Sequence, residues 1–309
     1  MPKYFVNSYL FACFASFFRK KYSKYIMQVV KSIIELQSLL DSYRLEGKSI
    51  GLVPTMGALH NGHLSLVDRC KQLNDICVVS IFVNPIQFND SQDLINYPRT
   101  EESDCRQLET IACDCVFIPE IKEIYPEPDN RQFDFGILSQ VMEGAFREGH
   151  FNGVAQVVSK LFCIVGPDNA YFGEKDFQQL VIIRAMVKYL DLATTIISCP
   201  IVREIDGLAM SSRNMRIVEE VRPEACEIYK TLQKSQKMAF KHSVGELKEM
   251  VIATLALVKS LRLEYFEIVD GYSLQAISDW SQTEYPVACI AVFCGEVRLI
   301  DNIAYKIKD

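Results

Sequence analysis

The stretch that decides the fold class is residues 50–83, IGLVPTMGALHNGHLSLVDRCKQLNDICVVSIFV. It contains two apolar runs, 50–53 and 76–83, and each has the length of a strand. The second run, ICVVSIFV, is almost entirely apolar and β-branched, which is typical of a parallel strand covered on both faces. Between the runs, residues 63–73 have the apolar spacing of a helix, and 54–62 form a turn. The stretch therefore predicts a strand–helix–strand unit.

The same alternation extends in both directions. It predicts an α/β domain over residues 27–203, a doubly wound, Rossmann-like parallel sheet. Over 204–309, helical patterns precede strands, so we expect a smaller α+β lid domain there. The expected helices are 28–45, 101–111, 152–165, 176–190, 217–236 and 244–261; the further expected strands are 114–118, 169–172, 194–199, 264–270, 286–294 and 296–300.

Residues 1–26 form a separate extension. Its apolar run, YLFACFASFF at 9–18, is too short for a membrane-spanning helix, which needs about 20 residues. Most of its positive charge follows the run, whereas a signal peptide has the charge first. We expect a disordered extension or an upstream translation start, with membrane association as the less favoured alternative.

Composition narrows the classes of function. Of 309 residues, 49% are hydrophobic and 23% charged, an ordinary globular balance. A net charge of −6 argues against a nucleic-acid-binding surface, although it leaves room for a basic pocket that binds a phosphorylated ligand. The 11 cysteines include no C-x-x-C pair. Cys113 and Cys115 are two positions apart in an expected strand, so both side chains lie on the same face of it. We interpret them as reduced core residues of a cytoplasmic protein, because a zinc site needs a different ligand spacing.

The strongest motif is VPTMGALHNGH at residues 53–63, between a strand and a helix. A helix start offers free backbone N–H groups and a positive dipole end to a phosphate, and Gly62 removes side-chain bulk so that the phosphate can approach. His60 and His63 can then donate hydrogen bonds as charge builds during displacement of pyrophosphate. The alternative is a loop with two surface histidines. The H-x-G-H pattern is typical of nucleotidyltransferases and related adenylate-forming enzymes.

Three further segments carry candidate ligand-binding side chains, two of them just after strands and one in a flexible loop. Lys175, in GEKDFQQ, lies beside the carboxyl end of a strand, where α/β folds bind ligands. Arg213, in MSSRN, can bridge phosphate oxygens. Asn84 and Gln87, in SIFVNPIQF, suit a substrate with hydroxyl and carboxylate groups, although Asn84 could instead cap the turn before a proline. A last segment, 143–153, forms a mobile lid or a helix connection.

Together these segments resemble the pantothenate synthetase family, over everything except the extension. The resemblance rests on seven blocks in order, VPTMGALHNGH, VSIFVNPIQF, YPRT, EGAFREGHFNGV, VSKLF, GEKDFQQL and DGLAMSSRN, and on RLIDN near the end. It implies that pantoate attacks the α-phosphate of ATP, with Mg²⁺ present, and releases pyrophosphate. The amine of β-alanine then attacks the bound pantoyl adenylate and releases pantothenate and AMP.

The resemblance also implies roles for residues. His60, His63, Lys175 and Arg213 would be catalytic, with His63 as proton donor and Lys175 neutralising the phosphates. The less direct carry-overs are Tyr97, Asp104 and Arg147. The implied substrate positions are, for ATP, Met56, Gly57, Ala58, Leu59, His60, Asn61, Gly62, His63, Gly173, Glu174, Lys175, Asp176, Val202, Met210, Ser211, Ser212 and Arg213, and, for pantoate and β-alanine, Pro54, Met56, Asn84, Gln87 and Gln179.

Some features stay open. Glu148 and Asn152 stand where the family often has proline and a basic residue, which affects the expected lid more than the chemistry. The family suggests a homodimer, and Mg²⁺ carried mainly by the phosphates of ATP, so no protein ligands are assigned. The rivals are another nucleotidyltransferase, which would need cations around its acceptor, a fragment of an aminoacyl-tRNA synthetase, and a catalytically idle nucleotide-binding protein. The group that deprotonates β-alanine is not identified.

Overall fold

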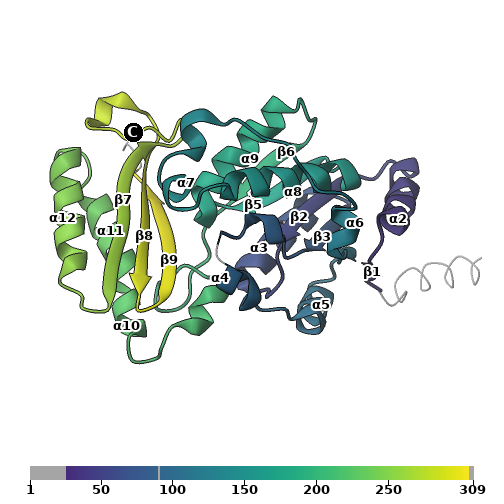
Figure 1. Ribbon diagram of the computed structural model, residues 1–309, viewed down its shortest axis with the longest axis horizontal. Coiled ribbons are helices and arrows are strands. Elements are labelled where there is room, and N and C mark those ends of the chain that lie inside the picture. The colour runs from purple at the N-terminus through teal and green to yellow at the C-terminus, as the bar shows by residue number, and fades with distance from the viewer. Residues whose placement is uncertain (1–25, 90, 306–309) are drawn as a thin grey trace, which may run out of the picture.

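The computed structural model describes residues 26–89 and 91–305. The extension predicted at 1–26 lies, apart from Ile26, outside the described residues. In Figure 1 a parallel sheet with helices on both faces occupies one end of the molecule, and a smaller sheet with helices on its outer side occupies the other.

The larger sheet has six parallel strands in the order β1-β4-β3-β2-β5-β6. Strands β2 and β3, which come from residues 50–83, pair in parallel in one unbroken register. The register runs from Ile50 opposite Ile76 to Thr55 opposite Ile81. The doubly wound fold predicted from the sequence is confirmed. The strands are β1 Gln28–Val30, β2 Ile50–Thr55, β3 Ile76–Ile81, β4 Cys115–Phe117, β5 Asn169–Gly173 and β6 Thr195–Cys199.

One predicted helix was wrong at its start. The helix expected from residue 28 begins only at Ile33, because Gln28–Val30 is the edge strand β1 and pairs with β4. Ser32 has an extended backbone, and its side chain accepts a hydrogen bond from the backbone N–H of Glu35. This N-cap fixes where the helix starts.

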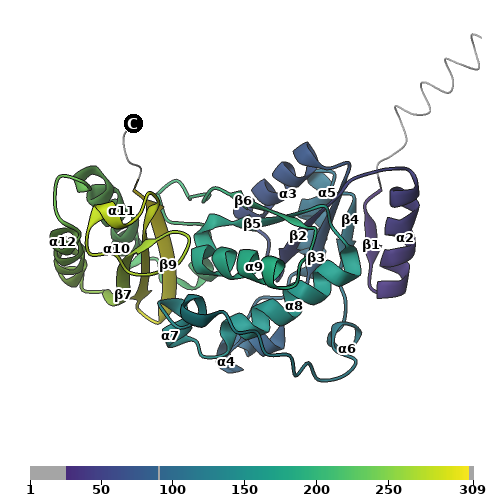
Figure 2. The same ribbon diagram turned by 90° about the horizontal axis from the view of Figure 1, so that it is seen from above.

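Helices cover both faces of this sheet (Figures 1 and 2). Side chains alternate along each strand, so Val78 packs into the core on one face and Val79 into the core on the other. The first core lies against α2 (Ile33–Leu45), α8 (His150–Val165) and α9 (Phe177–Tyr189), and the second against α3 (Asn61–Leu73) and α5 (Glu101–Thr110). The shorter helices are α4 Ser91–Ile95, α6 Ile121–Ile124, α7 Glu143–Phe146, η1 Pro85–Gln87, η2 Gly136–Ser139 and η3 Glu174–Asp176.

The C-terminal part is an antiparallel sheet, β7-β8-β9, packed against helices. The single helix expected at 217–236 was wrong: residues 217–221 are not helical, the short α10 starts at Arg222 with Pro223 in its first turn, and a second helix starts at Glu227. Within the described ranges, no helix is long and apolar enough to cross a membrane. The elements are η4 Ser212–Arg216, α10 Arg222–Ala225, α11 Glu227–Met238, α12 Val244–Ala256, β7 Leu261–Asp270, η5 Trp280–Gln282, β8 Pro286–Cys294 and β9 Val297–Ala304.

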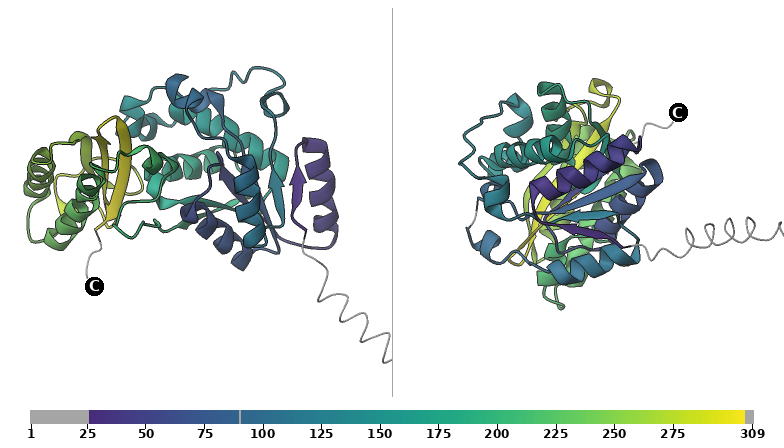
Figure 3. Two further views of the ribbon diagram at one scale, coloured as in Figure 1. Left: turned by 90° about the horizontal axis from the view of Figure 1, so that it is seen from below. Right: turned by 90° about the vertical axis from the view of Figure 1, so that its right-hand side faces the viewer.

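Polar contacts join the two parts. Glu143, on α7, is buried and accepts two hydrogen bonds of 2.8 Å from the Arg298 guanidinium on β9. Arg203 makes a bidentate pair with Asp301, and the side-chain amide of Asn302 donates to the carbonyls of Glu174 and Lys175. Figure 3 shows the smaller sheet at the end of the molecule away from β1 and α2. The division at 203/204 remains a prediction.

Candidate active site

A cleft opens at the carboxyl ends of the parallel strands. Strand β2 lies between β3 and β5, and the chain leaves it toward β3 but reaches β5 only after β4. Ligands bind at such a reversal of strand order in open α/β sheets. The described residues that line this cleft include most of the predicted site: Pro54, Met56, His60, Gly62, His63, Gln87, Tyr97, Gly173, Lys175, Asp176, Gln179, Val202, Met210, Ser211, Ser212 and Arg213.

The β2–α3 turn is closed by its two histidines. His60 is the N-cap of α3, and its Nδ1 accepts a hydrogen bond of 3.1 Å from the Gly62 N–H. In return, His63 Nδ1 accepts one of 3.3 Å from the His60 N–H, which completes a reciprocal capping box. The two ring centroids lie 4.1 Å apart. A rigid local structure therefore holds both imidazoles at the cleft.

This geometry revises the prediction for the helix start. The N–H of Gly62 is not free for a phosphate, because His60 already binds it. A side chain at Gly62 would collide with the His60 ring, whose Nδ1 would lie 2.9 Å from the added carbon. Gly62 therefore makes room for an imidazole that folds back over the turn. The imidazoles present polar groups to the cleft in place of the backbone.

The hydrogen bonds also fix the tautomer of each ring. An Nδ1 that accepts from a backbone N–H carries no proton, so the proton of the neutral ring is on Nε2. Burial is the main cause that lowers the pKa of both rings, and Lys175 adds to it; the pKa of His63 falls to about 3. At neutral pH both rings are uncharged, and each has an Nε2–H donor available for a ligand.

Asp104 supports the turn from behind. Its buried carboxylate accepts hydrogen bonds from the N–H groups of Ala58, at 3.0 Å, and Leu59, at 2.8 Å, and from the Thr100 hydroxyl. Gly57 and Ala58 have φ angles of +80° and +49°, the left-handed conformation that brings these N–H groups around one carboxylate. Asp104 therefore lies behind the turn and does not line the main cleft.

Cations line the other side of the cleft. Lys175 lies after β5, and its backbone carbonyl accepts a hydrogen bond from Asn302 on β9. The Arg213 guanidinium is paired with Asp93 at 2.8 Å, and the backbone N–H of Arg213 donates to the Ser211 hydroxyl. The main cleft continues into a second hollow between the two sheets, which Arg147, Lys175 and Arg213 also line.

Amides form the junction of the cleft and this hollow. Gln87 and Gln179 line both of them, together with Met56. Asn84 is buried and does not line either, because it hydrogen-bonds to Gln87 and to the Gly153 carbonyl, each at 3.1 Å. The structure therefore places Asn84 behind Gln87. The other predicted positions outside the main cleft are Gly57, Ala58, Leu59, Asn61, Glu174, Asp104 and Arg147.

His150 is a functional candidate that the predicted site omits. It is buried at the start of α8 and lines the second hollow. Its Nδ1 lies 2.8 Å from the Gln87 carbonyl, which can only accept, so Nδ1 carries the proton and Nε2 is a bare acceptor. Burial lowers its pKa to about 4. The sequence signal was its position in the segment 143–153.

Carboxylates are scarce in the main cleft. Asp176 lines it and lies 3.8 Å from Lys175, while the oxygens of Asp104 are already bonded to the turn. Among the described side chains, no group of three His, Cys, Asp or Glu residues is arranged to hold a metal ion.

Comparison with known proteins agrees with the geometry. The family model for pantoate–β-alanine ligase matches residues 28–304. This chain belongs to the pantoate–β-alanine ligase family. A pantothenate synthetase from Phocaeicola vulgatus is 60% identical over 281 residues, which cover 91% of this chain and all of the relative.

Solved structures of the family have the same fold. A pantothenate synthetase from Thermus thermophilus superposes with a TM-score of 0.86 at 40% identity, covering 91% of this chain and 100% of that one. A pantoate–β-alanine ligase from Francisella tularensis, solved with β-γ ATP and β-alanine, has a TM-score of 0.76 at 34% identity, covering 92% and 99%.

Proposed function

We propose that this chain condenses pantoate with β-alanine to give pantothenate, through a pantoyl adenylate, and converts ATP to AMP and pyrophosphate. Family membership supports the reaction. The observation that carries it is the convergence of two imidazole donors, His60 and His63, with two neutral amides, Gln87 and Gln179, in one cleft. The imidazoles suit phosphate oxygens, and the amides suit the hydroxyl and carboxylate groups of pantoate.

In the first step, a carboxylate oxygen of pantoate attacks the α-phosphorus of ATP, and the bond to the pyrophosphate oxygen breaks. Negative charge moves onto the phosphate oxygens as this happens. The Nε2–H groups of His60 and His63 would donate to these oxygens, and Lys175 and Arg213 would balance the charge. Donors that are held in place before the reaction stabilise such charge most effectively.

Arg213 has further N–H donors for this role besides the one bonded to Asp93. Its guanidinium pairs with Asp93 through Nη2. A phosphate, like a carboxylate, can accept two parallel hydrogen bonds from a guanidinium, so the phosphates of ATP can compete with Asp93 for this side chain. Ser211 and Ser212, on the same loop, line the cleft beside it. We therefore expect ATP binding to draw this loop toward the phosphates.

In the second step, the amine of β-alanine attacks the acyl carbon of the adenylate, AMP leaves, and the nitrogen loses a proton. The second hollow is the proposed entry for β-alanine, because Arg147 could pair with its carboxylate and His150 lies in the same wall. The bare Nε2 of His150 is an acceptor for the amine hydrogen. The relative solved with β-alanine supports a site for this substrate within the fold.

The nucleotide would enter as its magnesium complex. The scarcity of carboxylates among the described residues of the main cleft supports a Mg²⁺ ion held mainly by phosphate oxygens, and Asp176 is the carboxylate that lines this cleft. We also propose a homodimer in the cytoplasm, with domains at 27–203 and 204–309. Sedimentation of the purified chain tests the dimer.

The decisive experiment follows AMP and pyrophosphate release from ATP–Mg²⁺. With pantoate and β-alanine both present, we expect steady production of AMP. With pantoate alone, we expect one equivalent of pyrophosphate per site, since the adenylate stays bound. No pyrophosphate release under either condition would reject the proposed function.

A further inference from the structure

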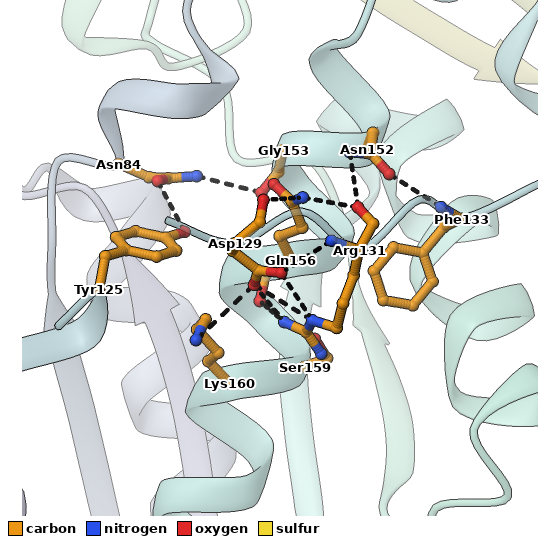
Figure 4. A network of polar contacts seen from close by, with 10 residues as sticks. All are labelled: Asn84, Tyr125, Asp129, Arg131, Phe133, Asn152, Gly153, Gln156, Ser159 and Lys160. Carbon is orange, nitrogen blue, oxygen red and sulfur yellow. Dashed lines mark hydrogen bonds and ion pairs between the residues drawn. The ribbon is translucent and has the colours of Figure 1, made fainter. Parts of the chain in front are cut away.

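Asn84 lies behind the cleft, and its side-chain amide has three hydrogen-bond partners. It is 1% exposed, and three groups converge on it: one from η1, which follows it directly, and two from distant segments, α8 and the chain just after α6. Figure 4 shows two of them, Tyr125 and the Gly153 carbonyl, on opposite ends of the amide. Each partner restricts which end of the amide it can face.

The Gly153 carbonyl settles the orientation of Asn84. A carbonyl oxygen can only accept, so the atom 3.1 Å from it must be the amide nitrogen Nδ2. Helix α8 approaches η1 too closely for a side chain at Gly153, whose added carbon would lie 2.6 Å from the Ile86 carbonyl oxygen. This close packing brings the carbonyl within reach of Asn84.

Tyr125 fixes the same orientation from the other end. Its hydroxyl lies 3.0 Å from Asn84 Oδ1, and burial raises the pKa of the phenol, so it stays protonated and donates. The ammonium of Lys160 lies over the Tyr125 ring, 5.3 Å from its centroid. The following segment is bound to α8 through Gln156, which donates to the carbonyls of Asp129 and Arg131 (Figure 4).

The orientation of the Asn84 amide also fixes the orientation of the Gln87 amide. The second hydrogen of Asn84 Nδ2 points to the amide of Gln87, which must therefore accept with Oε1, at 3.1 Å. The nitrogen Nε2 of Gln87 remains, with one contact of 3.0 Å to the weak acceptor Met56 Sδ. Gln87 therefore presents hydrogen-bond donors to the cleft.

We propose that Tyr125 and Asn84 are positioning residues that hold the Gln87 amide with its NH₂ group toward the substrate. The chain from Tyr125 to Asn84 to Gln87 makes Gln87 a donor to an anionic oxygen of pantoate; this last assignment rests on the proposed function. A reversed amide would face the pantoate carboxylate with its own carbonyl oxygen, and the two acceptors would repel each other. In this proposal Asn84 does not make the substrate contact that was expected from the sequence, but supports Gln87.

The test is the Tyr125→Phe variant, which removes the hydroxyl and keeps the ring. Loss of one hydrogen bond of ordinary strength should lower kcat/KM for pantoate by about three- to tenfold, with the KM values for ATP and β-alanine unchanged. The matched control is Tyr305→Phe, which removes another buried hydroxyl, bonded to Ser235 in the C-terminal part. The control should leave kcat/KM for pantoate as in the wild type.

A double-mutant cycle separates positioning from general destabilisation. If Tyr125 acts through Gln87, its substitution should have little further effect on pantoate use in a Gln87→Ala background. An equal effect in both backgrounds, or no effect of Tyr125→Phe on pantoate use, overturns the proposal. The Asn84→Asp variant should lower kcat/KM for pantoate more than Tyr125→Phe does, because an aspartate cannot donate to Gln87. Thermal unfolding checks that this variant folds.

These outcomes are distinct from failure of the proposed function. If the wild-type chain releases no pyrophosphate with pantoate, both the function and this assignment fall. If the wild type is active and only the cycle shows no coupling, the positioning role alone is rejected.

Discussion

The β2–α3 turn and the start of α8 use the same side chain with opposite polarity. In the turn, His60 and His63 accept at Nδ1 from backbone N–H groups and present Nε2–H donors. At the start of α8, His150 donates from Nδ1 to a backbone carbonyl and presents a bare Nε2 acceptor. Whether a neutral imidazole is a donor or an acceptor here depends on the backbone group it faces, not on its own pKa.

The difference matches two chemical tasks. Transfer of the α-phosphate builds negative charge, which needs donors, whereas attack by an amine releases a proton, which needs an acceptor. Burial lowers the pKa of all three rings, so each remains neutral and retains its tautomer at neutral pH. The two regions can therefore be tested one at a time.

The largest expected effect follows from removal of a donor. His63→Ala should slow adenylate formation by about 100-fold or more, as loss of a preorganised donor does at other anionic transition states. Single-turnover release of pyrophosphate with pantoate alone measures this step. The exposed His242, in the C-terminal part, provides a control, since His242→Ala removes an imidazole that does not line the cleft.

A second substitution at this position tests the polarity itself. In His63→Gln the side-chain amide can accept from the His60 N–H, as a glutamine does in an ordinary capping box, and still offer an N–H donor. We expect its adenylation rate to lie between those of the wild type and His63→Ala. Unchanged adenylation in both variants would remove His63 from the first step.

A smaller effect is expected at His150. In His150→Asn the amide nitrogen can replace Nδ1 as donor to the Gln87 carbonyl, but the acceptor at Nε2 is lost. The β-alanine-dependent step should slow by about tenfold, less than the ~10²- to 10⁴-fold that a general base typically contributes, because the lowered pKa makes this imidazole a weak base. Adenylation without β-alanine should stay the same. The reverse pattern, slow adenylation with a normal second step, would contradict the comparison.

Much of the fold followed from local pattern. Strand β3 was recognised because a strand covered on both faces needs nearly continuous apolar residues, and Val78 and Val79 do pack into opposite cores. Strand β1 was missed because its three residues continue the apolar spacing of the helix after it, and only its pairing with β4, far along the chain, makes it a strand. Short edge strands carry too little local signal.

Some residues of the candidate site could likewise be predicted from local sequence, and others could not. His60 and His63 were found together because they are neighbours in sequence, and Lys175 and Arg213 because each follows a strand or turn at the ligand edge. The supporting roles of Asp104 and Asn84 depend on contacts with segments 41 or more positions away, such as the Leu59 N–H, the Gly153 carbonyl and the Tyr125 hydroxyl. The tautomers of the histidines depend on hydrogen bonds that residue types alone do not specify.

The last expected effect is on stability in acid, where the two regions should behave alike. The pKa values of His63 and His150, about 3 and 4, lie below the value of about 6.5 for an unfolded histidine. Between these limits the unfolded chain binds more protons, so the free energy of unfolding falls as pH drops from 6.5 toward 4. Each histidine contributes at most about 1.4 kcal/mol per pH unit.

Urea denaturation at pH 5 and pH 7 measures this change, and His63→Gln and His150→Asn should each make it smaller. The structural consequence of protonation differs between the two sites. A proton on His63 must enter at Nδ1 and break the capping bond, whereas a proton on His150 enters at Nε2 and leaves its bond to Gln87 intact. Equal pH dependence in the wild type and both variants would mean that neither ring is held neutral by the fold. The assignment of opposite tautomers would then lose its basis.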